Sequence, residues 1–257
     1  MFKMIYNIAR TELQMLFYSP VAWLILVIFG IQSGLLFADQ LTPLVNSQEM
    51  GRSIQGATMR IFANRWGGVF IVMQNYLYFY IPLLTMSLVS KELSSGSIRL
   101  LYSSPITNTQ IIVGKFFSMM IYGLIMIGIL FLLSLCSWAI IKDFEFPMVL
   151  TGLLGLYLLI CAYAAIGIFM SSLTSYQIVA AIGTFAVLMI LSMIGGWWQD
   201  YNFIRDVTYW LSMPGRSEKF IAGLICSENV LYFVIVICLF LALTIIRLNS
   251  VRQKIRF

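Results

Sequence analysis

The sequence predicts an all-α protein that crosses a membrane six times. Of its 257 residues, 61% are hydrophobic and 10% are charged, and the mean hydropathy is +0.93. Soluble domains have about 45–50% apolar and about 25% charged residues, so this chain lacks the polar groups that would cover a water-exposed globule. Lipid is therefore the expected solvent for most of the chain. The same composition excludes disordered, collagen-like and disulfide-scaffold proteins.

The expected spans follow from the long gaps between charged residues. A bilayer core about 30 Å thick is crossed by roughly 20 apolar residues in a helix. The uncharged stretch 146–199 is long enough for two spans, and the polar run Ser171–Gln177 divides it. Continuous apolar runs favour helices over barrel strands, whose residues alternate between two faces. We expect spans at 19–38, 69–90, 114–141, 148–170, 178–197 and 228–247.

The basic residues predict the orientation of these spans. An even number of spans places both termini on one side, and the segments of that side sum to a net charge of +7, against −1 on the other. Positive segments resist translocation, so we expect both termini to be cytoplasmic. The first apolar run is much longer than that of a signal peptide, which predicts a retained span.

Residues 1–17 have the pattern of an amphipathic helix. Phe2, Ile5, Ala9, Leu13 and Leu16 recur at spacings of three and four, which predicts a helix that lies in the inner membrane interface. Two interpretations stay open. The helix is either a simple anchor or an elbow that moves with a cytoplasmic partner.

The inner segment between the second and third spans is the most informative part outside the membrane. Serines and Gly96 precede a short apolar cluster around Leu100, and Pro105 with Asn108 follows it. This pattern predicts a short amphipathic helix that ends at a stop signal. Such a helix can dock in a groove of another protein, although an ordinary solvated connector has the same composition.

The outer segments are less specific. The polar loop 39–66 predicts a short helix near 56–65 and no ligand site. Residues 197–228 are too polar for a span and rich in Trp and Tyr, which is typical of an interfacial belt. After Pro214 we expect one or two short re-entrant or interfacial helices, and such irregular backbone needs a cover of protein or water.

Several kinds of machinery are not expected in this chain. Gly114-Lys115 lacks the first glycine and the hydroxyl residue of a phosphate-binding loop, so no ATP site is predicted. The absence of histidine argues against the usual zinc sites, and spans without internal charges argue against an ion-driven pump. We expect no catalytic residues, no metal and no nucleic acid, and the free cysteines have no C-x-x-C motif. Gln32, Gln74 and Asn75 are candidates for a translocation path or for helix–helix hydrogen bonds.

The segment 90–115 resembles the ABC-2 type permeases, the transmembrane subunits of ABC transporters. The matching positions are Glu92, Gly96, Ser97, Ile98, Leu100, Leu101, Ser103, Pro105, Ile106, Gln110, Ile111, Ile112, Gly114 and Lys115. Residues 8–13, 172–180, 219–225 and 229–233 are similar to the branch of the gliding-motility permease and, less closely, to the permease of nitrous-oxide-reductase maturation. Ser97 departs from the threonine, and Asn229 from the aspartate, that are common in this family.

The resemblance implies a type V exporter fold in the bacterial cytoplasmic (inner) membrane. In this fold an interfacial helix precedes the six spans, residues 90–106 are a coupling helix seated in an ATPase, and residues 201–225 form an outer re-entrant hairpin that acts as a gate. The implied coupling residues are Glu92, Gly96, Ile98, Arg99, Leu101, Pro105, Thr174 and Gln177. The implied gate residues are Arg216, Phe220 and Gly223. On this view Glu92 braces the coupling helix, Gly96 allows a tight approach and Arg99 meets an acidic groove.

The implied assembly pairs two permeases with two ATP-binding subunits, which hold the ATP and Mg²⁺. The second permease is another copy or a paralogue, and an extracytoplasmic accessory protein is a further candidate partner beside membrane lipid. We expect one transmembrane domain, 1–257, that works as an exporter by alternating access. The alternative is a membrane anchor that transmits force in a motility or assembly complex and moves no substrate.

Overall fold

The computed structural model describes residues 2–49, 56–64, 67–97, 106–141, 144–193 and 212–256, and it contains no strand in these ranges. The described helices are α1 (Phe2–Tyr18), α2 (Pro20–Glu49), α3 (Ala57–Phe62), α4 (Val69–Thr85), α5 (Ser90–Ser95), α7 (Asn108–Ile140), α8 (Phe146–Leu173), α9 (Gln177–Met193), α11 (Met213–Ile221) and α12 (Ser227–Arg256).

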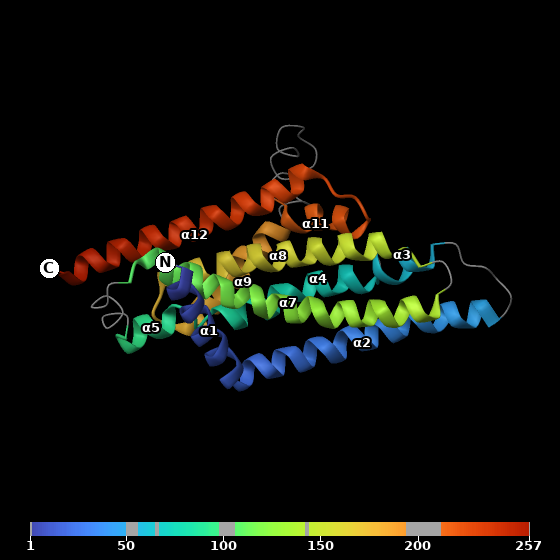
Figure 1. Ribbon diagram of the computed structural model, residues 1–257, viewed down its shortest axis with the longest axis horizontal. Coiled ribbons are helices and arrows are strands. Elements are labelled where there is room, and N and C mark those ends of the chain that lie inside the picture. The colour runs from blue at the N-terminus through green and yellow to red at the C-terminus, as the bar shows by residue number, and fades with distance from the viewer. Residues whose placement is uncertain are drawn as a thin grey trace.

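The long helices lie side by side along the long axis of the molecule (Figure 1). Both termini, α1 and α5 lie at one end, which we call the terminal end, whereas α3 and α11 lie at the opposite end (Figure 1). Helix α8 forms the centre of the bundle, since 72% of its most apolar window is buried, compared with 17% for α12. The expected placement of both termini at one end is therefore present in the fold.

Five of the predicted spans correspond to helices that are long and apolar enough to cross a membrane. They are Pro20–Pro43, Val69–Ser95, Asn108–Ile140, Phe146–Leu173 and Ser227–Gln253. The expected span 178–197 corresponds to α9, an apolar helix whose described part ends at Met193. Its last predicted residues lie outside the described part of the chain.

The second span differs from the expected single helix 69–90. Helix α4 ends at Thr85, a turn follows, and α5 begins at Ser90. The turn is held by the Ser171 hydroxyl of α8, which accepts hydrogen bonds from the amides of Val89 (3.1 Å) and Ser90 (3.0 Å) and donates to Met86 O (2.9 Å). Because the partner is distant in sequence, local pattern could not reveal this break.

Other helix ends also shift from their predicted positions. Helix α7 begins at Asn108 rather than 114, because Thr107 and Gln110 form a capping box in which each side chain bonds the backbone N–H of the other. Helix α2 continues through Pro43 to Glu49, so the loop expected from residue 39 is shorter. The short helix expected near 56–65 is α3.

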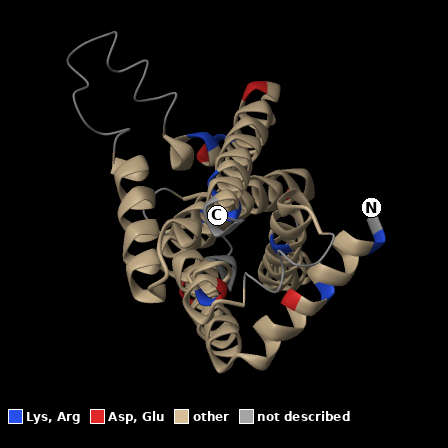
Figure 2. Ribbon diagram, turned by 90° about the vertical axis from the view of Figure 1, so that its left-hand side faces the viewer, with Lys and Arg blue, Asp and Glu red and all other residues tan. Residues whose placement is uncertain are grey.

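The predicted amphipathic helix at the N-terminus is α1. It crosses the outside of the bundle at the terminal end before the chain turns into α2 (Figure 2). Ala9 and Leu16 are buried, while Lys3 and Arg10 are exposed, as the pattern predicts. Glu12 lies among the buried residues of this helix, which no hydrophobic pattern explains.

Candidate functional site

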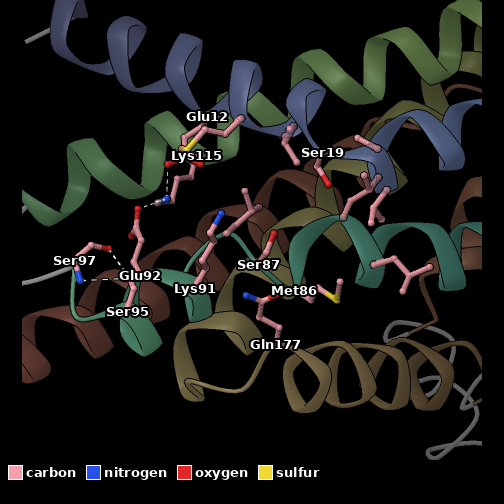
Figure 3. Close-up of a pocket in the computed structure, with 17 residues that line it drawn as sticks. Glu12, Ser19, Met86, Ser87, Lys91, Glu92, Ser95, Ser97, Lys115 and Gln177 are labelled. Carbon is pink, nitrogen blue, oxygen red and sulfur yellow. Dashed lines mark hydrogen bonds and ion pairs between the residues drawn. The ribbon is translucent and has the colours of Figure 1, made fainter.

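The terminal end holds a buried ion-pair cluster that joins three helices. The Lys115 ammonium of α7 lies 2.5 Å from Glu12 Oε1 of α1 and 2.7 Å from Glu92 Oε1 of α5 (Figure 3). The side chain of Lys115 is 2% exposed, and those of Glu12 and Glu92 are 10% and 18% exposed. We call Glu12, Glu92 and Lys115 the charge cluster.

The sequence around Lys115 explains why the three groups meet. The capping box fixes the start of α7, which sets the position of Lys115 two turns later. Gly114 lets α1 approach, since a Cβ built there would lie 2.7 Å from Ile8 Cγ2. Glu12 is one helical turn after Ile8, so both side chains lie on the face of α1 that packs against α7.

The cluster has unequal charge. One ammonium faces two carboxylates, and burial makes each unpaired charge costly because water no longer screens it. This arrangement corrects the expectation that no span contains an internal charge, since Lys115 lies within α7. No group of three His, Cys, Asp or Glu residues in the described ranges could hold a metal ion.

The predicted coupling residues are only partly described. Glu92 lies in the first turn of α5 and Gly96 closes that helix with a φ of +70°, whereas Ile98, Arg99, Leu101 and Pro105 lie outside the described residues. The expected tight approach at Gly96 concerns the ATPase and stays a prediction, and no described atom of this chain lies within 4 Å of a Cβ built there. Its left-handed conformation is by itself a reason for glycine at this position.

The other two predicted coupling residues, Thr174 and Gln177, lie at the turn before α9, close to Glu92. Gln177 and Glu92 line one cavity of about 370 Å³ at the terminal end (Figure 3). The half-buried Thr174 accepts a hydrogen bond from the amide of Tyr176 (3.2 Å), which supports the turn locally. The structure therefore brings together two of the predicted segments that are far apart in the sequence.

The predicted outer-gate residues lie at the opposite end, on and after α11. Arg216 is buried, donates to Asn229 Oδ1 (3.0 Å) and lies 4.3 Å from the centre of the Tyr232 ring. Phe220 packs on α8 at Gly155, where a Cβ would overlap it, and Gly223 ends this segment with a φ of +89°. Residues 201–211 of the expected hairpin lie outside the described part.

The candidate path residues mainly join helices. Gln74 is buried, donates to Pro214 O (3.4 Å) and accepts from Ser217 Oγ (2.6 Å), so it ties α4 to α11. Gln32 accepts a hydrogen bond from the Tyr80 hydroxyl and so joins α2 to α4. Asn75 alone of the three is exposed. For Gln32 and Gln74, the structure favours the helix–helix interpretation.

Comparison with models of known protein families identifies the family of this chain. The model of a family described as ABC-2 family transporter protein matches residues 6–200, which is most of the chain. The chain belongs to the ABC-2 transporter family. No curated protein matches the chain. It is accordingly a transmembrane permease subunit of an ABC transporter, a membrane protein that works with an ATP-binding partner rather than the ATPase itself.

The match includes the entire charge cluster of the permease but not α11 and α12. Lys115 is part of the family motif, but the sequence assigned it no role and did not reveal its ion pair with Glu12. One signal was available: Glu12 lies three residues after Ala9 and four before Leu16, on the apolar face of α1, where an isolated carboxylate requires a partner.

Proposed function

We propose that this permease is half of the membrane part of an exporter and that two ATP-binding subunits drive it. The ATP and Mg²⁺ belong to the ATPase, and the second permease is another copy or a paralogue. The apolar helix α9 supports a sixth span, and the basic residues near both termini support a cytoplasmic terminal end in a bacterial inner membrane.

The charge cluster is the observation that carries this proposal. The segment 90–106, which we propose as the coupling helix, begins with α5, and α5 is tied through Glu92 to Lys115 of α7 and from there to Glu12 of α1. A displacement of α5 by the ATPase would then move α1 and α7 with it, because separating the three groups would leave buried charges without their partners.

The test targets the segment that we propose for docking. Arg99→Glu and Leu101→Asp together should abolish copurification of the ATPase and the stimulation of its hydrolysis by the permease. Arg247→Glu is the matched control, because Arg247 is exposed near the C-terminal end of α12 and is not in the coupling segment. Unchanged association of the double variant would refute the docking site.

The second candidate function is force transmission without transport, as the similarity to the gliding-motility branch suggested. The tightly packed centre around α8 supports this function, because a rigid helical bundle transmits movement from one end to the other. Proteoliposomes that contain the permease and its ATPase separate the two functions. ATP-dependent accumulation of labelled lipid-linked glycan or peptide supports export, whereas hydrolysis without movement of any tested cargo favours the force-transmitting anchor.

A further inference from the structure

The cavity beside the charge cluster has the location of a lipid-headgroup site. It has a volume of about 370 Å³ and lies between the junction of α1 and α2, the break between α4 and α5, and the start of α9 (Figure 3). This volume is within the range of about 300–1,000 Å³ that is usual for small-molecule sites.

Exposed aromatic residues mark the level of the cavity. Tyr18 is 87% exposed and adjoins Ser19, which lines the cavity, and Tyr176 is 73% exposed and adjoins Gln177 on the other side. Trp23 is also exposed and its indole N–H donates to Phe17 O (2.8 Å). Exposed Tyr and Trp beside apolar helices are typical of the membrane–water interface, so the cavity lies at the level of the lipid headgroups.

The cavity presents both signs of charge. Glu12 and Glu92 each bond Lys115 through Oε1, and their second carboxylate oxygens have no hydrogen-bond partner among the described residues. Lys91 also lines the cavity, is exposed and forms no ion pair within the described ranges. The site therefore offers acceptors for a cation and, at its rim, one cation for an anion.

We propose that this cavity binds the headgroup of an aminophospholipid such as phosphatidylethanolamine. The primary ammonium supplies the positive charge that the cluster lacks and donates to the free carboxylate oxygens, while the phosphate pairs with Lys91. The apolar wall, which includes Val21 and Leu83, continues toward the acyl chains. Phosphatidylglycerol has no cation, and the choline group has no N–H to donate.

This inference does not depend on the proposed function. It needs only that the terminal end reaches a lipid headgroup layer, and it is the same for an exporter and for a force-transmitting anchor. A bound aminophospholipid would rest against α1, α5 and α7 at once and would complete the charge balance of the cluster.

The experiment measures which lipids the full-length permease retains. The protein is exchanged into nanodiscs of phosphatidylethanolamine, phosphatidylglycerol and phosphatidylcholine in equal amounts, extracted in mild detergent, and analysed by native mass spectrometry. We expect retained phosphatidylethanolamine to exceed the other two lipids by about tenfold, the effect of about one charge-assisted hydrogen bond.

Three variants separate a specific site from the general lipid shell. Glu92→Gln should reduce this preference several-fold, and Lys91→Ala should lower the retention of all three lipids because each carries the phosphate. Lys3→Ala, a change of an exposed lysine on α1 outside the cavity, should leave both the preference and the retention unchanged. Lys91 is exposed, so its variant is not expected to disturb folding. Retention in proportion to the mixture, an equal retention of phosphatidylcholine, a preference that survives Glu92→Gln, or an unchanged retention in Lys91→Ala would overturn the proposal.

Discussion

Lys115 is the residue on which the terminal end of the bundle depends. It is buried, and it is the shared partner of carboxylates on two helices that are distant in sequence. A buried ion pair contributes little by comparison with a well-packed apolar pair, but loss of one partner leaves uncompensated charge. Here the loss of Lys115 would leave two carboxylates facing each other.

Replacement of Lys115 by Met should therefore lower the free energy of unfolding by about 3–5 kcal/mol. The triple variant Lys115→Met, Glu12→Gln, Glu92→Gln should recover part of this loss, because it removes the buried charges together. Unfolding by SDS, followed by circular dichroism, measures both. Lys3→Met is the control for loss of an exposed lysine. A triple variant less stable than Lys115→Met would contradict this account of the cluster.

At the level of the elements, small residues decide which helices can touch. Gly114 brings α1 against α7, Gly167 brings α4 against α8 at Thr85, and Gly155 receives Phe220 of α11. In an apolar solvent, close packing of this kind replaces the hydrophobic driving force that associates helices in water. The charge cluster at the terminal end thus depends on Gly114 as much as on its charges.

Gly114→Ala should loosen α1 and lower the free energy of unfolding by about 1–3 kcal/mol, because the new Cβ meets Ile8. Gly128→Ala in the same helix is the matched control, since no atom lies within 4 Å of a Cβ built there. Hydrogen exchange of the α1 amides should rise in Gly114→Ala alone. The double variant Gly114→Ala, Ile8→Ala should recover protection, and equal exchange in both glycine variants would disprove the contact.

At the level of the whole molecule, the fold places the chain ends and the turn before α12 at opposite ends of the bundle. Helix α12 runs from Ser227 beside α11 to the C-terminus at the terminal end (Figure 1). The permease therefore presents two surfaces to two compartments, and the basic residues predict which is cytoplasmic.

Cysteine labelling tests this orientation. A variant that keeps only the half-buried Cys226, with Cys136, Cys161 and Cys238 replaced by Ala, should react with a membrane-impermeant maleimide in intact cells. A cysteine-free variant carrying Ser250→Cys, an exposed position near the C-terminus, should react only after permeabilisation. The reverse pattern would show that the terminal end faces outward.

Much of the architecture could be predicted from the sequence because it depends on local composition. The apolar runs predicted six spans, five of which are helices of membrane-spanning length, the spacing of Ala9 and Leu16 predicted α1, and the motif from Glu92 to Lys115 predicted the family. The break at Met86–Val89 could not be predicted, because the Ser171 hydroxyl that holds it lies on another helix.

Hydropathy and charge, which are sums over neighbouring residues, determined by themselves that this protein resides in a membrane and is helical, and the motif in residues 90–115 indicated the transporter family. Tertiary structure alone decided what the polar residues do. It paired Lys115 with both Glu12 and Glu92, and it made Gln32 and Gln74 hydrogen-bonded links between helices. The reason is physical: the value of a buried charge or amide depends on its partner, and partners are chosen by packing across the chain.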